Sequence, residues 1–88
     1  MRLAAVMTPA QSRAARGWLE WSQDELARRA NVSVGTVRSF EAGLKTPLPN
    51  NIAAMRRAVE DAGVVLLFDQ EGKGIGISLA KTSERLRS

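Results

Sequence analysis

The sequence predicts a small, mainly α-helical domain of four to five helices that ends in a β-hairpin or in dimer-forming strands. Helix-start patterns at Thr8 and Ser22 each precede a stretch in which apolar residues recur at helical spacing. Two further helical stretches follow before Gly63. Beyond that glycine the apolar residues become β-branched and then alternate with small or polar ones, as is typical of strands.

The composition limits the class of protein. A chain of 88 residues allows one small domain. It has no cysteine and no histidine, so we expect no catalytic residues, no metal site and no cofactor. The 13 Lys and Arg residues against 9 Asp and Glu give a net charge of +4, which indicates a polyanionic partner or only a soluble surface. No apolar run has the length of a membrane helix, and MRLAAVM is too short for a secretory signal, so we expect a cytoplasmic protein without a membrane partner.

The first two helices each begin with a recognisable N-capping pattern. The stretch TPAQ combines a capping Thr8, a proline at the first helical position and Gln11 placed for a capping box. The stretch SQDE repeats the pattern, with Ser22 as N-cap and Glu25 reaching back to it, and this second helix is expected to run to about residue 30.

A third helix is expected to begin at Ser33 and to stop at Gly43, and the two prolines of KTPLPN indicate a loop after it. Asn50 or Asn51 is expected to cap a fourth helix that ends at Gly63. The apolar residues of this fourth helix recur at helical spacing: Ile52, Met55, Val59 and Ala62.

The link between the second and third helices predicts a steep crossing. Ala27 is the small residue that such a crossing needs at its closest approach, and Asn31 tolerates the positive φ of a tight link. The residues expected to face one core are Leu26, Ala27, Ala30, Val32, Val37 and Phe40.

The last part of the chain predicts two strands. VVLLF is apolar and β-branched, DQEGKG is turn material and IGISL alternates. GKGIG lacks the spacing of a phosphate-binding loop, and its glycines are interpreted as part of the turn of a β-hairpin. The expected organisation is an N-terminal appendage (1–7), a helical domain (8–63), a strand pair (64–80) and a flexible tail (81–88).

The stretch SQDELARRANVSVGTVRSFEAG resembles the phage-repressor helix-turn-helix family, the Cro and lambda-repressor group also called XRE-like, over roughly residues 8–62. It matches the family's pattern of S/T-Q-x-E-L-A, a turn, and V/I-x-x-x-E-x-G. The opening TPAQSRAAR and the closing AGVVLLF and GKGIGISL are similar to a compact bacterial subgroup of these regulators. The resemblance implies a lambda-repressor-like domain that binds double-stranded DNA.

The resemblance also implies roles for single residues. Gln23 matches a glutamine that contacts a DNA phosphate, and Lys45 and Thr46 lie where the family often makes phosphate contacts. Arg16 and Glu41 match a pair that often forms a buried salt bridge between the first and third helices. Glu20 stands where relatives often have glycine, so a positive φ there would cost about 1 kcal/mol.

The third helix has an outer face of small side chains. With Val37 and Phe40 inward, the helical wheel turns Gly35, Ser39 and Ala42 outward. Such a helix can lie deep in a major groove, or alternatively pack against another protein. Arg38 is the one long side chain, suited to a guanine or a phosphate. The expected DNA-binding residues are Gln23, Ser33, Val34, Gly35, Thr36, Arg38, Ser39, Lys45 and Thr46.

The strands are expected to form a dimer interface, because an isolated hairpin is marginal in water and strand edges pair with other chains. The predicted interface residues are Val64, Val65, Leu66, Leu67, Phe68, Ile75, Ile77 and Leu79. The alternative is that the hairpin folds back on the chain's own fourth helix. Trp18 and Trp21 are expected in core or dimer contacts rather than stacked on nucleic acid.

The expected function is a sequence-specific double-stranded DNA-binding regulator, a repressor, that acts as a homodimer without catalysis. One alternative is an antitoxin-like module that neutralises a toxin-like protein partner and regulates its own promoter. RNA binding is weaker, because the sequence has no surface stripe of aromatic residues for stacking bases.

Overall fold

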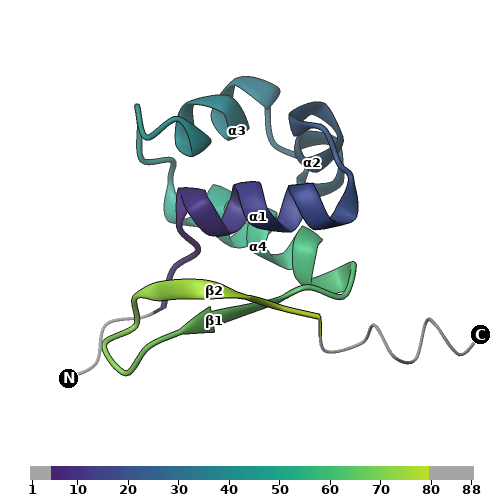
Figure 1. Cartoon of the computed structure of the whole chain (residues 1–88). Coiled ribbons are helices and arrows are strands. Elements are labelled where there is room, and N and C mark those ends of the chain that lie inside the picture. Colours follow the sequence, from purple (N-terminus) through teal and green to yellow (C-terminus); the bar gives the residue numbers. More distant parts are fainter. Residues whose placement is uncertain (1–4, 80–88) are drawn as a thin grey trace, which may run out of the picture.

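Four helices and one β-hairpin make up residues 5–79, which are the residues that the computed structural model describes. The helices are α1 (Pro9–Leu19), α2 (Gln23–Ala30), α3 (Val34–Glu41) and α4 (Pro49–Asp61), and the strands are β1 (Val65–Phe68) and β2 (Gly74–Ser78). Figure 1 shows α1 and α4 between α3 and the hairpin, so α3 and the hairpin lie at opposite ends of the molecule. The predicted fold class, a mainly helical domain with a C-terminal hairpin, is confirmed.

The beginning of α1 is a complete capping box. The hydroxyl of Thr8 accepts a hydrogen bond from the backbone N–H of Gln11 at 3.0 Å, and the side-chain carbonyl of Gln11 accepts from the backbone N–H of Thr8 at 3.0 Å. Two of the amides that a helix start leaves without partners are thereby satisfied.

The box predicted at α2 is only half formed. Ser22 accepts from the backbone N–H of Glu25 at 3.0 Å, as expected. The carboxylate of Glu25, however, bonds to Arg28 and Arg29 one turn further on, so its predicted reach back to Ser22 is wrong. Two cations at helical spacing compete better for this carboxylate than one backbone amide.

The predicted asparagine cap of α4 is also wrong. The cap position is occupied by Leu48, ahead of both asparagines, so the helix begins at Pro49 and has no side-chain cap bond. Proline suits the first helical position because its φ is already helical and it has no N–H to satisfy. The carbonyl of Leu48 accepts from the backbone N–H groups of Asn51 and Ile52 at 2.9 and 3.2 Å.

Two non-glycine residues in the described part of the chain take the left-handed conformation. Asn31 (φ 59°) ends α2, and Glu20 (φ 59°) ends α1, where the resemblance implied that a glycine would be more usual. Asparagine visits this region readily, whereas the glutamate carries a strain of about 1 kcal/mol.

One apolar core lies between the helices and the inner side of the hairpin. Met7 is buried in it (1% exposed), so its assignment to an N-terminal appendage is wrong. Arg56 of α4 helps to hold this segment by donating to the carbonyl of Ala5 at 3.1 Å. Residues 1–4 of the predicted appendage and the predicted tail, 81–88, lie outside the described residues. The core residues are Met7, Ala15, Leu26, Ala27, Ala30, Val37, Phe40, Ile52, Met55, Val59, Val64 and Leu66.

The side chain of Gln11 ties the hairpin to α1 by hydrogen bonds to both strands. The side-chain amide of Gln11 donates to the carbonyls of Leu67 (2.8 Å) and Gly76 (3.0 Å), which face each other across the antiparallel pair. A Cβ at Gly74 would lie 2.3 Å from the side-chain oxygen of Gln11, so only glycine fits at this approach.

This attachment decides which hairpin residues remain accessible. Val64 and Leu66, predicted as dimer contacts, are buried in the protomer's own core and have no surface to offer to a second copy. Val65, Leu67 and Ile75 are exposed. Those three residues therefore form the accessible apolar surface of the hairpin, which we call the outer hairpin face.

Candidate DNA-binding surface

The burial of α3 follows the helical wheel that its sequence predicts. Val37, Phe40 and Glu41 are buried. Gly35, Arg38 and Ala42 are exposed, and Val34, Thr36 and Ser39 are half-buried. Val34 packs against the core, which removes part of its surface from any partner. The side of α3 that faces solvent thus consists mainly of small side chains with one arginine.

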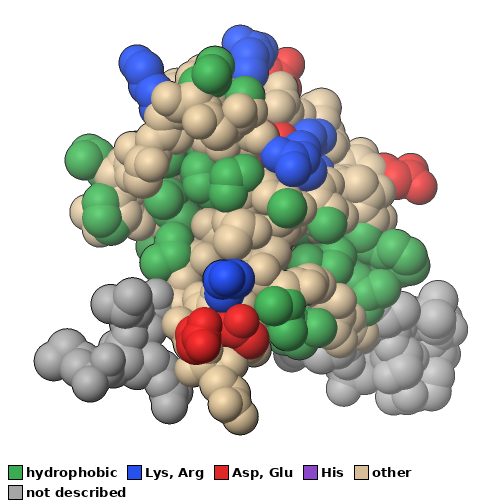
Figure 2. All heavy atoms as spheres, turned by 60° about the vertical axis from the view of Figure 1, so that its left-hand side comes forward, with side chains coloured by type: hydrophobic (Ala, Val, Ile, Leu, Met, Phe, Trp, Pro, Cys, Tyr) green, Lys and Arg blue, Asp and Glu red, His purple; other side chains and the backbone are tan. Residues whose placement is uncertain are grey.

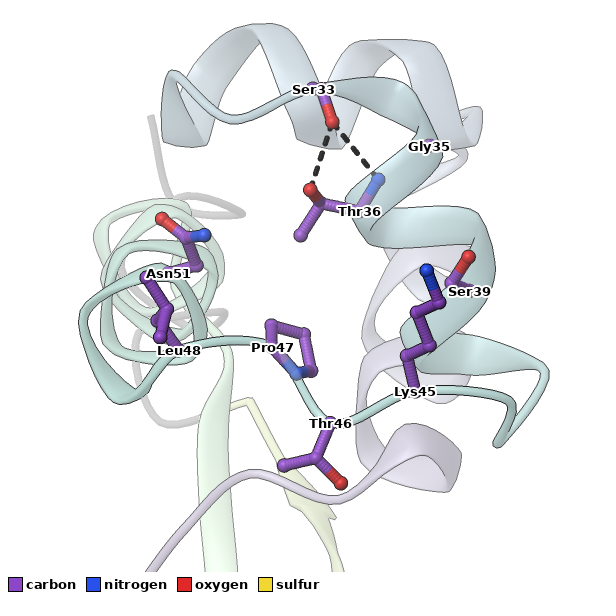
Figure 3. A pocket seen from close by; sticks show the side chains of 9 residues that line it. All are labelled: Ser33, Gly35, Thr36, Ser39, Lys45, Thr46, Pro47, Leu48 and Asn51. Atoms are coloured by element: carbon purple, nitrogen blue, oxygen red, sulfur yellow. Dashed lines mark hydrogen bonds between the residues drawn. The ribbon is translucent and has the colours of Figure 1, made fainter.

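A hollow of about 530 Å³ lies between α3, the loop after it and the start of α4. Figure 3 shows its lining side chains: Ser33, Gly35, Thr36, Ser39, Lys45, Thr46, Pro47, Leu48 and Asn51. The structure thus brings most of the predicted DNA-binding residues together around one concave surface. Gln23, Val34 and Arg38 lie outside this lining.

Sequence reasoning missed three residues of the hollow, namely Pro47, Leu48 and Asn51. Helical periodicity says nothing about the path of a loop, and Asn51 was assigned to a cap that it does not form. The useful indication was the pair of prolines on either side of Leu48, which restrict the loop and turn α4 back toward α3.

The hydroxyl groups at the start of α3 are bonded to each other. Ser33 caps the helix by accepting from the backbone N–H of Thr36 at 3.1 Å, and the two side-chain oxygens share a hydrogen bond of 2.8 Å. In Figure 3 the hydroxyl of Thr36 points to Ser33, whereas its methyl group points into the hollow. Thr36 therefore presents an apolar group to the hollow.

Two cations beside α3 have no carboxylate partner within residues 5–79. Arg38 and Lys45 form none of the ion pairs of this part of the chain, which involve Arg16, Arg28, Arg29 and Arg56. On the face shown in Figure 2, most Lys and Arg side chains lie in the upper part, at the level of α2 and α3. Arg38 and Lys45 are therefore available to an anionic partner at this end of the molecule.

A buried carboxylate joins the three helices behind this surface. Glu41 accepts from Arg16 through Nε (2.9 Å) and Nη2 (2.7 Å), from the hydroxyl of Ser12 (2.5 Å) and from the side-chain amide of Gln23 (3.0 Å). Its backbone carbonyl also accepts from Arg13. Arg16 and Glu41 thus form the ion pair that the resemblance implied.

Burial and hydrogen bonding act in opposite directions on Glu41. Burial acts to raise its pKa, while the hydrogen bonds from Arg16, Ser12 and Gln23 together outweigh burial, so the pKa lies below its usual value of 4.5. The group is charged at neutral pH and holds α3 against α1 and α2.

This network limits the predicted role of Gln23. One N–H of its side-chain amide is committed to Glu41, so a phosphate contact would use the second N–H or the backbone amides at the start of α2. The contact itself stays a prediction. Asp24 and Glu25 also lie in this first turn, and their charge opposes an approaching phosphate.

The two tryptophans differ in burial. Trp21 is half-buried against the core with the Arg29 guanidinium 4.4 Å from its ring centre. Trp18 is 57% exposed, so a core contact is wrong for this residue, while a dimer contact stays a prediction. Arg28 and Arg29 are exposed and paired with Glu25, as is usual for a solvated helix face.

Within residues 5–79, no helix has both the length and the apolar character needed to cross a membrane.

A capped support helix, a tight left-handed link and a short helix with a small, accessible outer face define a DNA-binding helix-turn-helix unit. Comparison with known protein families agrees with this helix-turn-helix assignment. The Helix-turn-helix family model matches residues 13–59, more than half of the chain, and the chain belongs to this XRE-type helix-turn-helix family. It is a DNA-binding helix-turn-helix regulator. No curated protein is significantly similar to it.

Proposed function

We propose that this protein is a bacterial transcriptional repressor, Cro-like in its use of α3, that binds a specific duplex sequence as a homodimer and catalyses no reaction. The observation that carries the proposal is the outer face of α3, where small side chains lie beside Arg38 and Lys45, two cations that have no ion-pair partner among residues 5–79. A helix with so little bulk can bring its backbone close to the base edges of a major groove.

The proposed contacts fall into two classes. Arg38 reads a base edge or holds a phosphate from the exposed side of α3. Lys45 and Thr46 hold the sugar-phosphate backbone at the rim of the hollow, with the second N–H of Gln23 on the other side. The phosphate contacts supply affinity, and the base contacts supply the choice of sequence.

The dimer is proposed to form along a free strand edge of the two-stranded hairpin, beside the outer hairpin face. The half-buried residues Phe68, Ile77 and Leu79 pack against the core, so part of their surface is already covered within the protomer. Because α3 and the hairpin lie at opposite ends (Figure 1), both α3 helices reach one duplex only if the two-fold axis runs from the hairpin toward α3. The hairpins would then meet side by side, with the α3 helices about 34 Å apart. Back-to-back contact would turn the two helices away from each other.

Selection of bound sites from random duplex DNA, followed by binding titrations at several salt concentrations, tests the proposal. We expect an inverted-repeat site and an affinity that falls with salt at a log-log slope of about −0.9 per phosphate contacted. Equal affinity for every duplex, or a flat response to salt, would contradict a sequence-specific regulator.

A second candidate is an antitoxin-like protein that neutralises a partner and represses its own promoter. The exposed Trp18 (57%) and Ile75 (62%) favour it, because large exposed apolar side chains are typical of protein contacts. Co-expression with the neighbouring reading frame decides between the two: relief of that product's toxicity supports the antitoxin, and its absence supports the dedicated repressor.

A further inference from the structure

Gly35 occupies a position where the fold does not require glycine. It lies inside α3, is exposed, and is not among the residues with positive φ. A Cβ built on Gly35 would meet only the Ser33 hydroxyl oxygen, at an ordinary contact distance of 3.9 Å. Since alanine is favoured over glycine in a helix and would fit here, the fold itself gives no reason for this residue.

The absence of a side chain at Gly35 would let a partner come close to the backbone of α3. Such a partner would then contact the next residue, Thr36. Its hydroxyl is already bonded to Ser33 at 2.8 Å, and its methyl group points into the hollow (Figure 3). The hydroxyl is turned toward Ser33 and the methyl toward the hollow (Figure 3), so the group that Thr36 presents to a partner in the hollow is apolar.

Unmodified DNA presents one apolar group in the major groove, the 5-methyl of thymine. We propose that the first turn of α3 reads a thymine in each half-site, with the Thr36 methyl against the thymine methyl and Gly35 allowing the helix backbone to come close. This inference rests on the proposed function and specifies its base preference. 5-Methylcytosine carries the same group, but in unmodified duplexes thymine is its only source.

The neighbouring residues fit this assignment less well. Val34 is also apolar, but it packs partly against the core. Arg38 is polar and long, and Ser39 carries a hydroxyl rather than a methyl. Thr36 is therefore the methyl-bearing side chain that α3 turns into the hollow.

The test uses the preferred duplex found by selection and replaces each thymine in turn by deoxyuridine, which lacks only the methyl. We expect one position per half-site at which the affinity falls about fourfold, the effect of leaving one methyl-sized group unburied. Thr36→Ser keeps the hydroxyl that Ser33 needs and removes the methyl. It should lose the same factor on the thymine duplex and nothing on the deoxyuridine duplex, whereas Thr36→Val should keep the sensitivity to thymine.

Gly35→Ala gives an independent readout in which stability and binding change in opposite directions. The melting temperature should stay at or above that of the wild type, since alanine favours the helix, while the affinity for the preferred duplex falls at least severalfold. Unchanged affinity in Gly35→Ala would overturn the close approach.

The failures are distinguishable. A protein without any preferred duplex would overturn the proposed function and this inference with it. A preferred duplex that tolerates deoxyuridine at every position, or a Thr36→Ser effect that is equal on both duplexes, would overturn the thymine contact alone. The deoxyuridine measurement uses the unaltered protein, so it decides the question even if a variant folds poorly.

Discussion

Gln23 and Glu41 are joined by a direct hydrogen bond of 3.0 Å, which links the first residue of α2 to the last residue of α3. The same carboxylate also accepts from Arg16 and Ser12 of α1. Three helices therefore converge on one buried charge behind the DNA-binding surface. The orientation of α3 depends on a polar contact as well as on the apolar core.

Glu41→Ala is expected to lower the free energy of unfolding by about 3–5 kcal/mol, because Arg16 would lose its ion-pair partner in a largely buried setting. Urea denaturation of both proteins measures the difference. Arg28→Ala is the control, since its solvent-exposed ion pair with Glu25 is screened by water and contributes little to stability. A Glu41→Ala protein as stable as the wild type would show that the pair contributes nothing.

The same carboxylate predicts a dependence of stability on acid. The pKa of Glu41 is lower in the folded state than its usual value of 4.5, so the unfolded state binds more protons as the pH falls. The stabilisation is present above about pH 4.5 and is lost as the pH drops through the folded-state pKa. Urea denaturation from pH 7 to pH 3 should show a smaller decline for Glu41→Gln than for the wild type. Parallel declines would mean that other carboxylates dominate, Glu25 among them, since its pKa is also lowered by Arg28 and Arg29.

Of two glycines on β2, only Gly74 should lose stability when replaced by alanine. Gly74→Ala would place a Cβ 2.3 Å from Gln11 Oε1, so either the hairpin or the capping box has to shift. We expect a loss of about 1–3 kcal/mol, the cost of leaving a buried polar group unsatisfied. Gly76→Ala is the matched control, because its nearest neighbour would be Leu67 Cδ1 at 3.9 Å. Thermal denaturation compares the two, and equal stability would contradict the close contact.

Arg38→Ala should weaken DNA binding without changing the stability of the fold. Arg38 is exposed and unpaired within residues 5–79, so its loss should leave the melting temperature nearly unchanged. Binding to the preferred duplex should weaken by about 1–3 kcal/mol if Arg38 reads a base. Arg57→Ala removes the same charge from an exposed position on α4 and serves as the control. An equal loss on all duplexes would identify Arg38 as a phosphate anchor.

Removal of the whole hairpin would not test the dimer cleanly, because Val64 and Leu66 belong to the core. Ile75→Asp is the better variant, since this side chain is 62% exposed. In sedimentation equilibrium at micromolar concentration we expect the wild type to have about twice its chain mass of 9.6 kDa, and the variant to be a folded monomer. A monomeric wild type would overturn the dimer and leave DNA binding intact.

Local chemistry made much of the fold predictable. The caps at Thr8, Ser22 and Ser33 and the left-handed Asn31 depend on a few consecutive residues, and each lies where the sequence places it. The outer face of α3 followed from helical spacing alone. These features need no knowledge of the rest of the chain.

The remaining features depend on contacts between distant segments. Met7 is buried in a core to which α4 and the hairpin also contribute residues, which no local pattern reveals. Gln11 was predicted only as a capping residue, yet its amide also holds both strands. Likewise, the hollow exists because the loop around Pro47 returns toward α3, and the path of a loop is not encoded in periodicity.

The bonds of Gln11 also set an order for folding in the cell. They join α1 to carbonyls that lie 56 and 65 residues further along the chain. Chains are synthesised from the N-terminus, so the side-chain amide of Gln11 cannot complete its hydrogen bonds until most of the polypeptide has been made. The nascent protein therefore reaches its final form late, and a chain truncated before residue 74 would lack both β2 and the Gly76 carbonyl that Gln11 binds.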